Sequence, residues 1–252
     1  MVEANPAPKK YLLGRPKMAQ FFSKLEEGSS TGAVSLYLKP GLSERELQNM
    51  AGIPASLPLP DELIRTAVKS TNGAVIFWGS RGKYLVLPPF PIKEKAIFDG
   101  YEAEPLGRML AGEHRIGLVL LHLGSYAVGV CQGETLLSSK VGTGLVHGRH
   151  RKGGSSQQRF QRRREKQVDE FLDRVCGHAR EHLEPLKKEL DYLVYGGPRQ
   201  TVLRLRKRCP FLGSFDDRVL PLLDVPTLRQ KVLETAVVRV WSSHIIEWPD
   251  DV

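Results

Sequence analysis

The sequence is poor in the features that mark membrane, secreted and disulfide-built proteins. No stretch approaches the roughly 20 consecutive apolar residues of a membrane helix, and the N-terminus lacks the apolar segment of a secretory signal. Cysteine is scarce: Cys131, Cys176 and Cys209 are odd in number and far apart in the sequence. These absences predict a chain that stays out of the membrane, in a reducing cytoplasm. With 252 residues it is long enough to form a core without disulfides or metals.

The most glycine-rich segment, residues 142–156, also lacks the residues of the common catalytic chemistries. It contains no cysteine, no carboxylate and no lysine-serine pair of the nucleotide-binding kind, so we expect no cofactor and no metal. Further along, His178 and His182 with nearby Cys176 form half a metal site at most. Two solvent-facing histidines are the simpler interpretation of that spacing.

What the chain does have is a concentrated positive charge. The net charge is +9, and residues 149–166 supply +7 of it through eight basic residues and one acidic residue. Arginine predominates, and its planar fork suits phosphate oxygens, so the segment predicts a nucleic-acid partner. The candidate RNA-binding residues are Arg149, Arg151, Lys152, Arg159, Arg162, Arg163 and Arg164. On charge alone, such a segment is most often a binding patch without catalysis.

Hydrophobic patterning predicts two α/β units, covering residues 1–110 and 111–252. In the first unit we expect helices at 17–27 and 60–71 and strands at 33–38, 73–78 and 84–87. In the second unit we expect an antiparallel meander at 115–123, 126–131 and 134–141, then a helix at 157–183, a strand at 192–195, a helix at 199–208, a strand near 218–223 and a helix at 226–241.

The predicted helix over residues 157–183 is unusual because only its second half is amphipathic. Its apolar residues keep helical spacing at Val168, Phe171, Leu172, Val175 and Leu183. Among its first ten residues, Phe160 is the one apolar residue. A helix of this length spans about 40 Å, so its basic front end and the preceding loop can stand clear of the core as an arm.

The junction of loop and helix carries a resemblance to a known family. The run HGRHRKGGSSQQRFQRRREKQ resembles the catalytic loop and following helix of the eukaryotic and archaeal type of peptide-chain release factor, where Gly-Gly-Gln precedes Arg-Phe and an arginine-rich helix. Gly153-Gly154 and Arg159-Phe160 match, but Ser155 stands where that family has its glutamine. Gly154-Ser155-Ser156-Gln157 is similar instead to the motif of the Vms-like peptidyl-tRNA hydrolases of ribosome quality control: glycine, two variable residues and glutamine.

This resemblance implies roles for the loop residues. Gln157 would orient a water against the ester carbonyl, since an amide donates and accepts hydrogen bonds at once. Gly153 and Gly154 would shape the loop, and Gln158 is a rival for the catalytic place. The arginines would meet ribosomal RNA or the acceptor end of tRNA.

The resemblance also implies a fold, partners and a pathway. Residues 111–252 would form a release-factor-like catalytic domain, a mixed α/β fold with a central mixed sheet and flanking helices, and residues 1–110 a reduced, smaller α/β first domain. The partners would be the large ribosomal subunit, at the RNA of the peptidyl transferase centre, and peptidyl-tRNA; the free chain would be a monomer. Because an Asn-Ile-Lys-Ser sequence is absent, ribosome rescue is favoured over stop-codon decoding.

Two alternatives to peptidyl-tRNA hydrolysis stay open. One is a non-catalytic module that binds the ribosome or RNA through its arginines alone. The other is a nuclease that cuts the 3′ end of tRNA on the same scaffold. The sequence does not choose between cleavage of the ester and cleavage of the tRNA.

Overall fold

In the computed structural model the chain folds into two compact units, each with its own sheet. The structure describes residues 7–28, 32–50, 58–146, 155–225 and 231–249, with the backbone alone at residues 155–157. The first unit contains residues 1–112 and 241–252, and the second contains residues 113–240. None of the helices in the described ranges combines the length and the apolar composition of a membrane span.

The first unit is built on an antiparallel sheet of six strands in the order β1-β10-β4-β3-β2-β5. These strands are β1 (Lys9–Leu13), β2 (Val34–Leu38), β3 (Ala74–Gly79), β4 (Gly82–Leu87), β5 (Ala96–Asp99) and β10 (Ser243–Trp248). Every residue of β2 and β3 is buried, which accounts for their largely apolar sequences; the buried Ser35 of β2 donates a hydrogen bond to the carbonyl oxygen of Gly100. The predicted strand pair β3–β4 is confirmed, with Ser80 and Arg81 in its turn.

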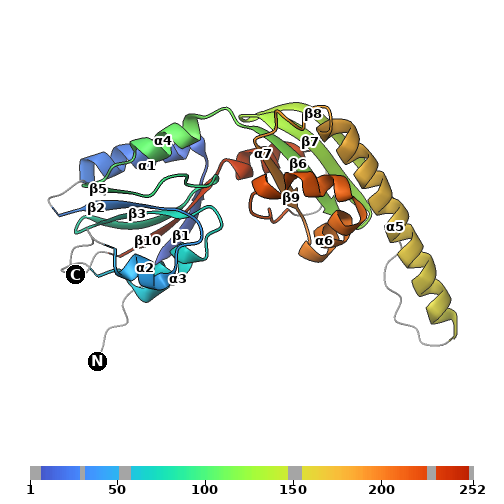
Figure 1. The fold of residues 1–252 in the computed structure, drawn as a ribbon, viewed down its shortest axis with the longest axis horizontal. Coiled ribbons are helices and arrows are strands. Elements are labelled where there is room, and N and C mark those ends of the chain that lie inside the picture. Colours follow the sequence, from blue (N-terminus) through green and yellow to red (C-terminus); the bar gives the residue numbers. More distant parts are fainter. Residues whose placement is uncertain (1–6, 29–31, 51–57, 147–154, 226–230, 250–252) are drawn as a thin grey trace. The chain divides into compact units, whose positions relative to one another are not determined.

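Helices cover both faces of this sheet (Figure 1). Alternate residues of β3 point to opposite faces, so Phe77 packs against Phe21 and Leu106 on one side, and Trp78 packs with Leu47 and Leu63 on the other. The helices on the first face are α1 (Arg15–Gly28) and α4 (Glu104–Ala111), and those on the second are α2 (Glu44–Gln48) and α3 (Asp61–Val68).

The second unit contains a mixed sheet of four strands in the order β8-β7-β6-β9. The strands are β6 (Arg115–His122), β7 (Ser125–Gln132), β8 (Thr135–Thr143) and β9 (Tyr192–Gly196). The first three form the predicted antiparallel meander, and β9 returns parallel to β6. The predicted fold class, a mixed α/β chain with a central mixed sheet and flanking helices, is confirmed.

Helices also flank both faces of the second sheet. Val128 and Val130 of β7 face the core formed with α5, α6 and η1. Gly129 points to the other face, where Leu233 of α7 lies beside it. These elements are α5 (Ser155–Leu183), α6 (Arg199–Arg208), the 3₁₀ segment η1 (Pro210–Arg218) and α7 (Val232–Val240).

The C-terminal strand corrects the predicted division at residues 110 and 111. β10 pairs with β1 and β4, so the chain from Trp241 onward belongs to the first unit and not to a domain 111–252. Ile245 of β10 joins the first unit's core, which explains why the strand returns there. The predicted strand near 218–223 is reduced to isolated bridges at Val219 and Leu223, because the preceding residues form η1.

Candidate functional site

The predicted site residues fall at the start of α5 and in the segment before it. Gly153, Gly154, Arg149, Arg151 and Lys152 lie outside the described residues. The loop predicted at 142–156 ends two residues earlier than expected, because α5 begins at Ser155. The backbone of Gln157 therefore lies in the first turn of α5, with Gln158 beside it. First-turn N–H groups have no acceptor within the helix, and they favour negative charge nearby.

The N-terminal half of α5, residues 155–167, contributes no buried side chain among those described. Phe160 is 57% exposed, which is high for a phenylalanine. Arg159, Arg162 and Arg163 are exposed, and none of them forms an ion pair within the described part of the chain. We call this stretch the bare half of α5. The charge of these three arginines is available to an outside partner.

The C-terminal half of α5, residues 168–183, is fixed firmly to its unit, and we call it the anchored half. Its side chains supply one stripe of the core. The buried members are Val168, Phe171, Leu172, Val175, Ala179 and Leu183, each at most 2% exposed. Their spacing of three and four residues is that of one helix face, as predicted from the sequence.

Charges on the anchored half are paired with α6. Asp169 accepts a hydrogen bond from Arg204 at 2.6 Å, and Asp173 accepts two from Arg208, at 2.5 and 2.7 Å. These bonds lower the pKa of Asp173 below its ordinary value. Along its length α5 thus changes from exposed arginines, three of which form no ion pair among the described residues, to acids that are paired with arginines of α6.

A disulfide between Cys176 and Cys209 joins the anchored half to the end of α6. Two cysteines that are 33 residues apart in the sequence are therefore bonded in the fold, and the sulfur of Cys176 is not available as a metal ligand. His178 pairs with Glu181 and stacks on Tyr126, and no group of three ligand residues is present among the described residues. The remaining cysteine, Cys131, is buried, and burial raises its pKa to about 12, so it stays a neutral thiol.

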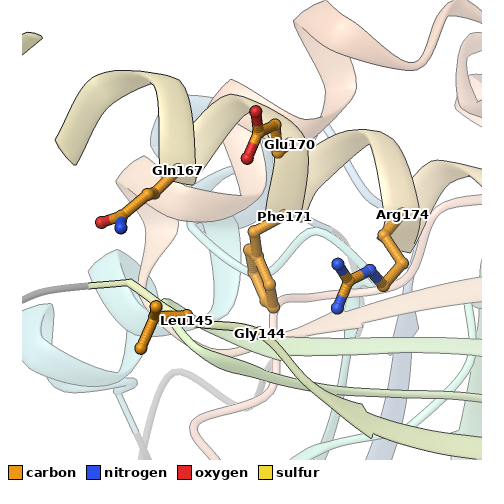
Figure 2. A pocket seen from close by; sticks show the side chains of 6 residues that line it. All are labelled: Gly144, Leu145, Gln167, Glu170, Phe171 and Arg174. Carbon is orange, nitrogen blue, oxygen red and sulfur yellow. The ribbon is translucent and has the colours of Figure 1, made fainter. Parts of the chain in front are cut away.

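The chain leaves β8 through a close contact with the anchored half (Figure 2). Phe171 and Arg174 point from α5 toward Gly144, which follows the last residue of β8. Arg174 donates a hydrogen bond from Nη1 to the carbonyl oxygen of Thr143 at 3.0 Å. A Cβ atom on Gly144 would lie 2.6 Å from the Phe171 ring, so only glycine fits there. A shallow pocket lies beside this contact, lined by Gly144, Leu145, Gln167, Glu170, Phe171 and Arg174.

The sequence did not predict the contact of Phe171 and Arg174 with the end of β8. It also did not predict the hydrogen bonds and the disulfide that join α5 to α6. The signal for the glycine was present, since Gly144 lies in the glycine-rich segment that begins where the predicted strand 134–141 ends. No sequence signal pointed to Arg174, because its partner is the backbone carbonyl of Thr143, and a residue of any type carries such a carbonyl.

Comparison with known proteins places these features in a family. A family model described as the Actinobacteria/chloroflexi VLRF1 release factor (acVLRF1) matches residues 114–246. Peptide chain release factor subunit 1 of Archaeoglobus fulgidus is 28% identical over 249 residues, which cover 84% of this chain and 60% of that protein. The Aeropyrum pernix protein of the same name is 27% identical, with 74% of this chain and 58% of that protein covered. The chain thus spans less than two thirds of their length.

Solved structures with similarity to this chain include an archaeal translation termination factor, aRF1. The two are 20% identical with a TM-score of 0.40, covering 90% of this chain and 70% of the other. Dom34 of S. cerevisiae, described as a translation termination-like factor, is 7% identical with a TM-score of 0.34, covering 93% and 64%. Because the family model matches more than half of its residues, this chain belongs to the acVLRF1 family of release factors.

Proposed function

We propose that this chain is a ribosome-rescue hydrolase that frees stalled nascent peptides from peptidyl-tRNA on the large ribosomal subunit. The observation that carries the proposal is the bare half of α5. It presents the exposed Arg159, Arg162 and Arg163 shortly after the two glutamines, on a helix whose other half is fixed in the core. Membership of a release-factor family supports the same reaction class.

In the proposed reaction Gln157 orients a water toward the ester carbonyl of peptidyl-tRNA. Its amide can accept a hydrogen bond from the water and donate one to the substrate, although it is too weak a base to remove a proton by itself. First-turn N–H groups of α5 favour the negative charge that develops on the carbonyl oxygen. Gly153 and Gly154 shape the approach, and ribosomal RNA of the peptidyl transferase centre completes the site. Gln158 is the alternative residue for the same role.

The arginines are proposed to bind RNA phosphates and so to bring Gln157 to the ester. This group comprises Arg149, Arg151, Lys152, Arg159, Arg162, Arg163 and Arg164. Phosphate contacts of this kind position a protein without reading sequence, which suits a factor that acts on many different stalled chains. The free chain is proposed to be a cytoplasmic monomer, as expected of a factor that meets ribosomes there.

Release from isolated large subunits that carry labelled peptidyl-tRNA tests this function. Wild type is expected to yield free peptide and intact tRNA. Gln157→Ala is expected to slow release by about a hundredfold or more, because one oriented hydrogen-bonding group is lost at the reacting centre. Gln161→Ala, an exposed glutamine one turn further along α5, is the matched control and should release like wild type.

The products and variants separate the alternatives. If shortened tRNA appears instead of intact tRNA, the chain is a tRNA nuclease. If wild type binds the subunit but changes neither ester nor tRNA, the chain is a binding module and the hydrolase proposal fails. If Gln158→Ala abolishes release while Gln157→Ala does not, the catalytic place belongs to Gln158.

A further inference from the structure

Arg174 connects the helix that carries the glutamines to the strand before them. It lies on the anchored half of α5, and its guanidinium donates to the carbonyl oxygen of Thr143, the last residue of β8. We infer that Arg174 is a positioning residue for release: it holds α5 against the end of β8, and thereby sets the place of Gln157. This inference rests on the proposed function.

Arg174 lies six residues beyond Val168, the first described side chain of α5 that the core buries. On the N-terminal side of Val168 the helix buries no side chain that the structure describes, so residues 168–174 act as the pivot of the bare half. Gln157 is 17 residues before Arg174, a distance of about 25 Å along the helix. A tilt of about 5° at the pivot would therefore move Gln157 by about 2 Å, and misplacement of about 1 Å can cost a hundredfold in rate.

The pivot is restrained from two sides by different elements. Toward α6, Asp169 and Asp173 accept hydrogen bonds from Arg204 and Arg208. Toward β8, Arg174 supplies the hydrogen bond to Thr143. Arg174 is exposed, so its side chain adds little to the core. Removing its guanidinium would release the β8 side of the pivot and leave the buried stripe in place.

The strand end that Arg174 holds is itself well fixed. The N–H of Gly144 donates to the carbonyl oxygen of Gly124 at 2.9 Å. Gly124 has φ of 99°, a conformation that glycine adopts without strain. The Phe171 ring lies against Gly144 so closely that a Cβ atom there would displace it. Arg174 is therefore bonded to a rigid point, which a positioning contact requires.

The test is release by Arg174→Ala and Arg174→Lys on the same large subunits, with turnover rate and KM measured separately. Arg174→Ala is expected to lower kcat about tenfold while KM changes less than about twofold, because geometry and not binding is lost. Arg174→Lys should recover most of kcat, since an ammonium can still donate one hydrogen bond to Thr143. Gly144→Ala, which pushes against Phe171, should lower kcat in the same way.

Arg180→Ala is the matched control. Arg180 is an exposed arginine on the same helix, six residues beyond Arg174 and paired with Glu184, so its loss removes the same charge away from the pivot. It should keep the wild-type kcat.

Several outcomes would overturn the inference. If Arg174→Ala keeps the wild-type kcat, Arg174 is not a positioning residue. The same follows if Arg174→Lys is as slow as Arg174→Ala. A rise in KM with unchanged kcat and a weaker salt dependence would make Arg174 a phosphate contact instead. Failure of the proposed function looks different: Gln157→Ala would then release like wild type, or wild type would release nothing, whatever Arg174 does.

Discussion

The two halves of α5 share one helix and differ in almost everything else. The anchored half buries a stripe from Val168 to Leu183, pairs Asp169 and Asp173 with α6 and is joined to Cys209. The bare half offers exposed arginines and an exposed Phe160. Contacts that stabilise the fold are concentrated in the anchored half. Arg159, Arg162 and Arg163, which are proposed to meet RNA, form no ion pair within the described residues, so they have none to break on binding.

Two phenylalanines on the same helix give the largest expected difference between the halves. Phe171 is 2% exposed and lies in the core, so Phe171→Ala should lower the free energy of unfolding by about 3–5 kcal/mol. Phe160→Ala, at 57% exposure, should change it by no more than about 0.5 kcal/mol. Urea denaturation of both variants measures this. Equal losses would show that the bare half is packed in the free protein.

The Cys176–Cys209 disulfide should contribute the next largest effect. It closes a loop with a sequence separation of 33, so reduction should destabilise the chain by about 3–4 kcal/mol if its action is mainly on the unfolded state. Denaturation with and without a reductant measures the loss, and thiol titration counts the cysteines released. Three titratable thiols in the unfolded chain without reductant would show that the bond is absent. Cys131→Ala removes the remaining thiol and serves as the control for the count.

The bare half should dominate affinity for the ribosome. Replacing Arg159, Arg162 and Arg163 with alanine should weaken binding to the large subunit about a hundredfold. It should also reduce the slope of log affinity against log salt by about three, one for each phosphate contact. Sedimentation binding at several salt concentrations measures both quantities. Stability should change little, because these side chains have no ion pair among the described residues.

A charge-matched triple variant sharpens this test. Lys187, Lys188 and Lys207 are exposed and lie outside the bare half. Replacing them with alanine should leave the salt slope nearly unchanged. Equal losses in the two triple variants would mean that overall charge, and not the bare half of α5, drives binding.

Local pattern predicted the elements that fold with near neighbours. The meander β6–β7–β8 and the anchored half were predicted because alternation and helical spacing reveal which face is buried. β10 was not predicted, and its residues were assigned to the unit 111–252, because its partners, β1 and β4, are far away in the sequence. The disulfide and the Arg174 bond were missed for the same reason: each depends on a contact across the fold, which no local pattern records.

The smallest expected effect concerns the acids of the anchored half. The hydrogen bonds from Arg208 lower the pKa of Asp173 in the folded chain. A carboxylate with a lowered folded pKa stabilises the fold above its unfolded pKa, near 4, and loses that contribution as the pH falls through the folded value. Because the Asp173 side chain is 55% exposed, Asp173→Asn should cost less than about 1 kcal/mol at pH 7. The difference between wild type and Asp173→Asn should shrink below pH 4, as measured by denaturation across pH. A difference that persists at pH 2 would assign the effect to packing rather than charge, and would leave the disulfide and the buried stripe as the ties that distinguish the anchored half from the bare one.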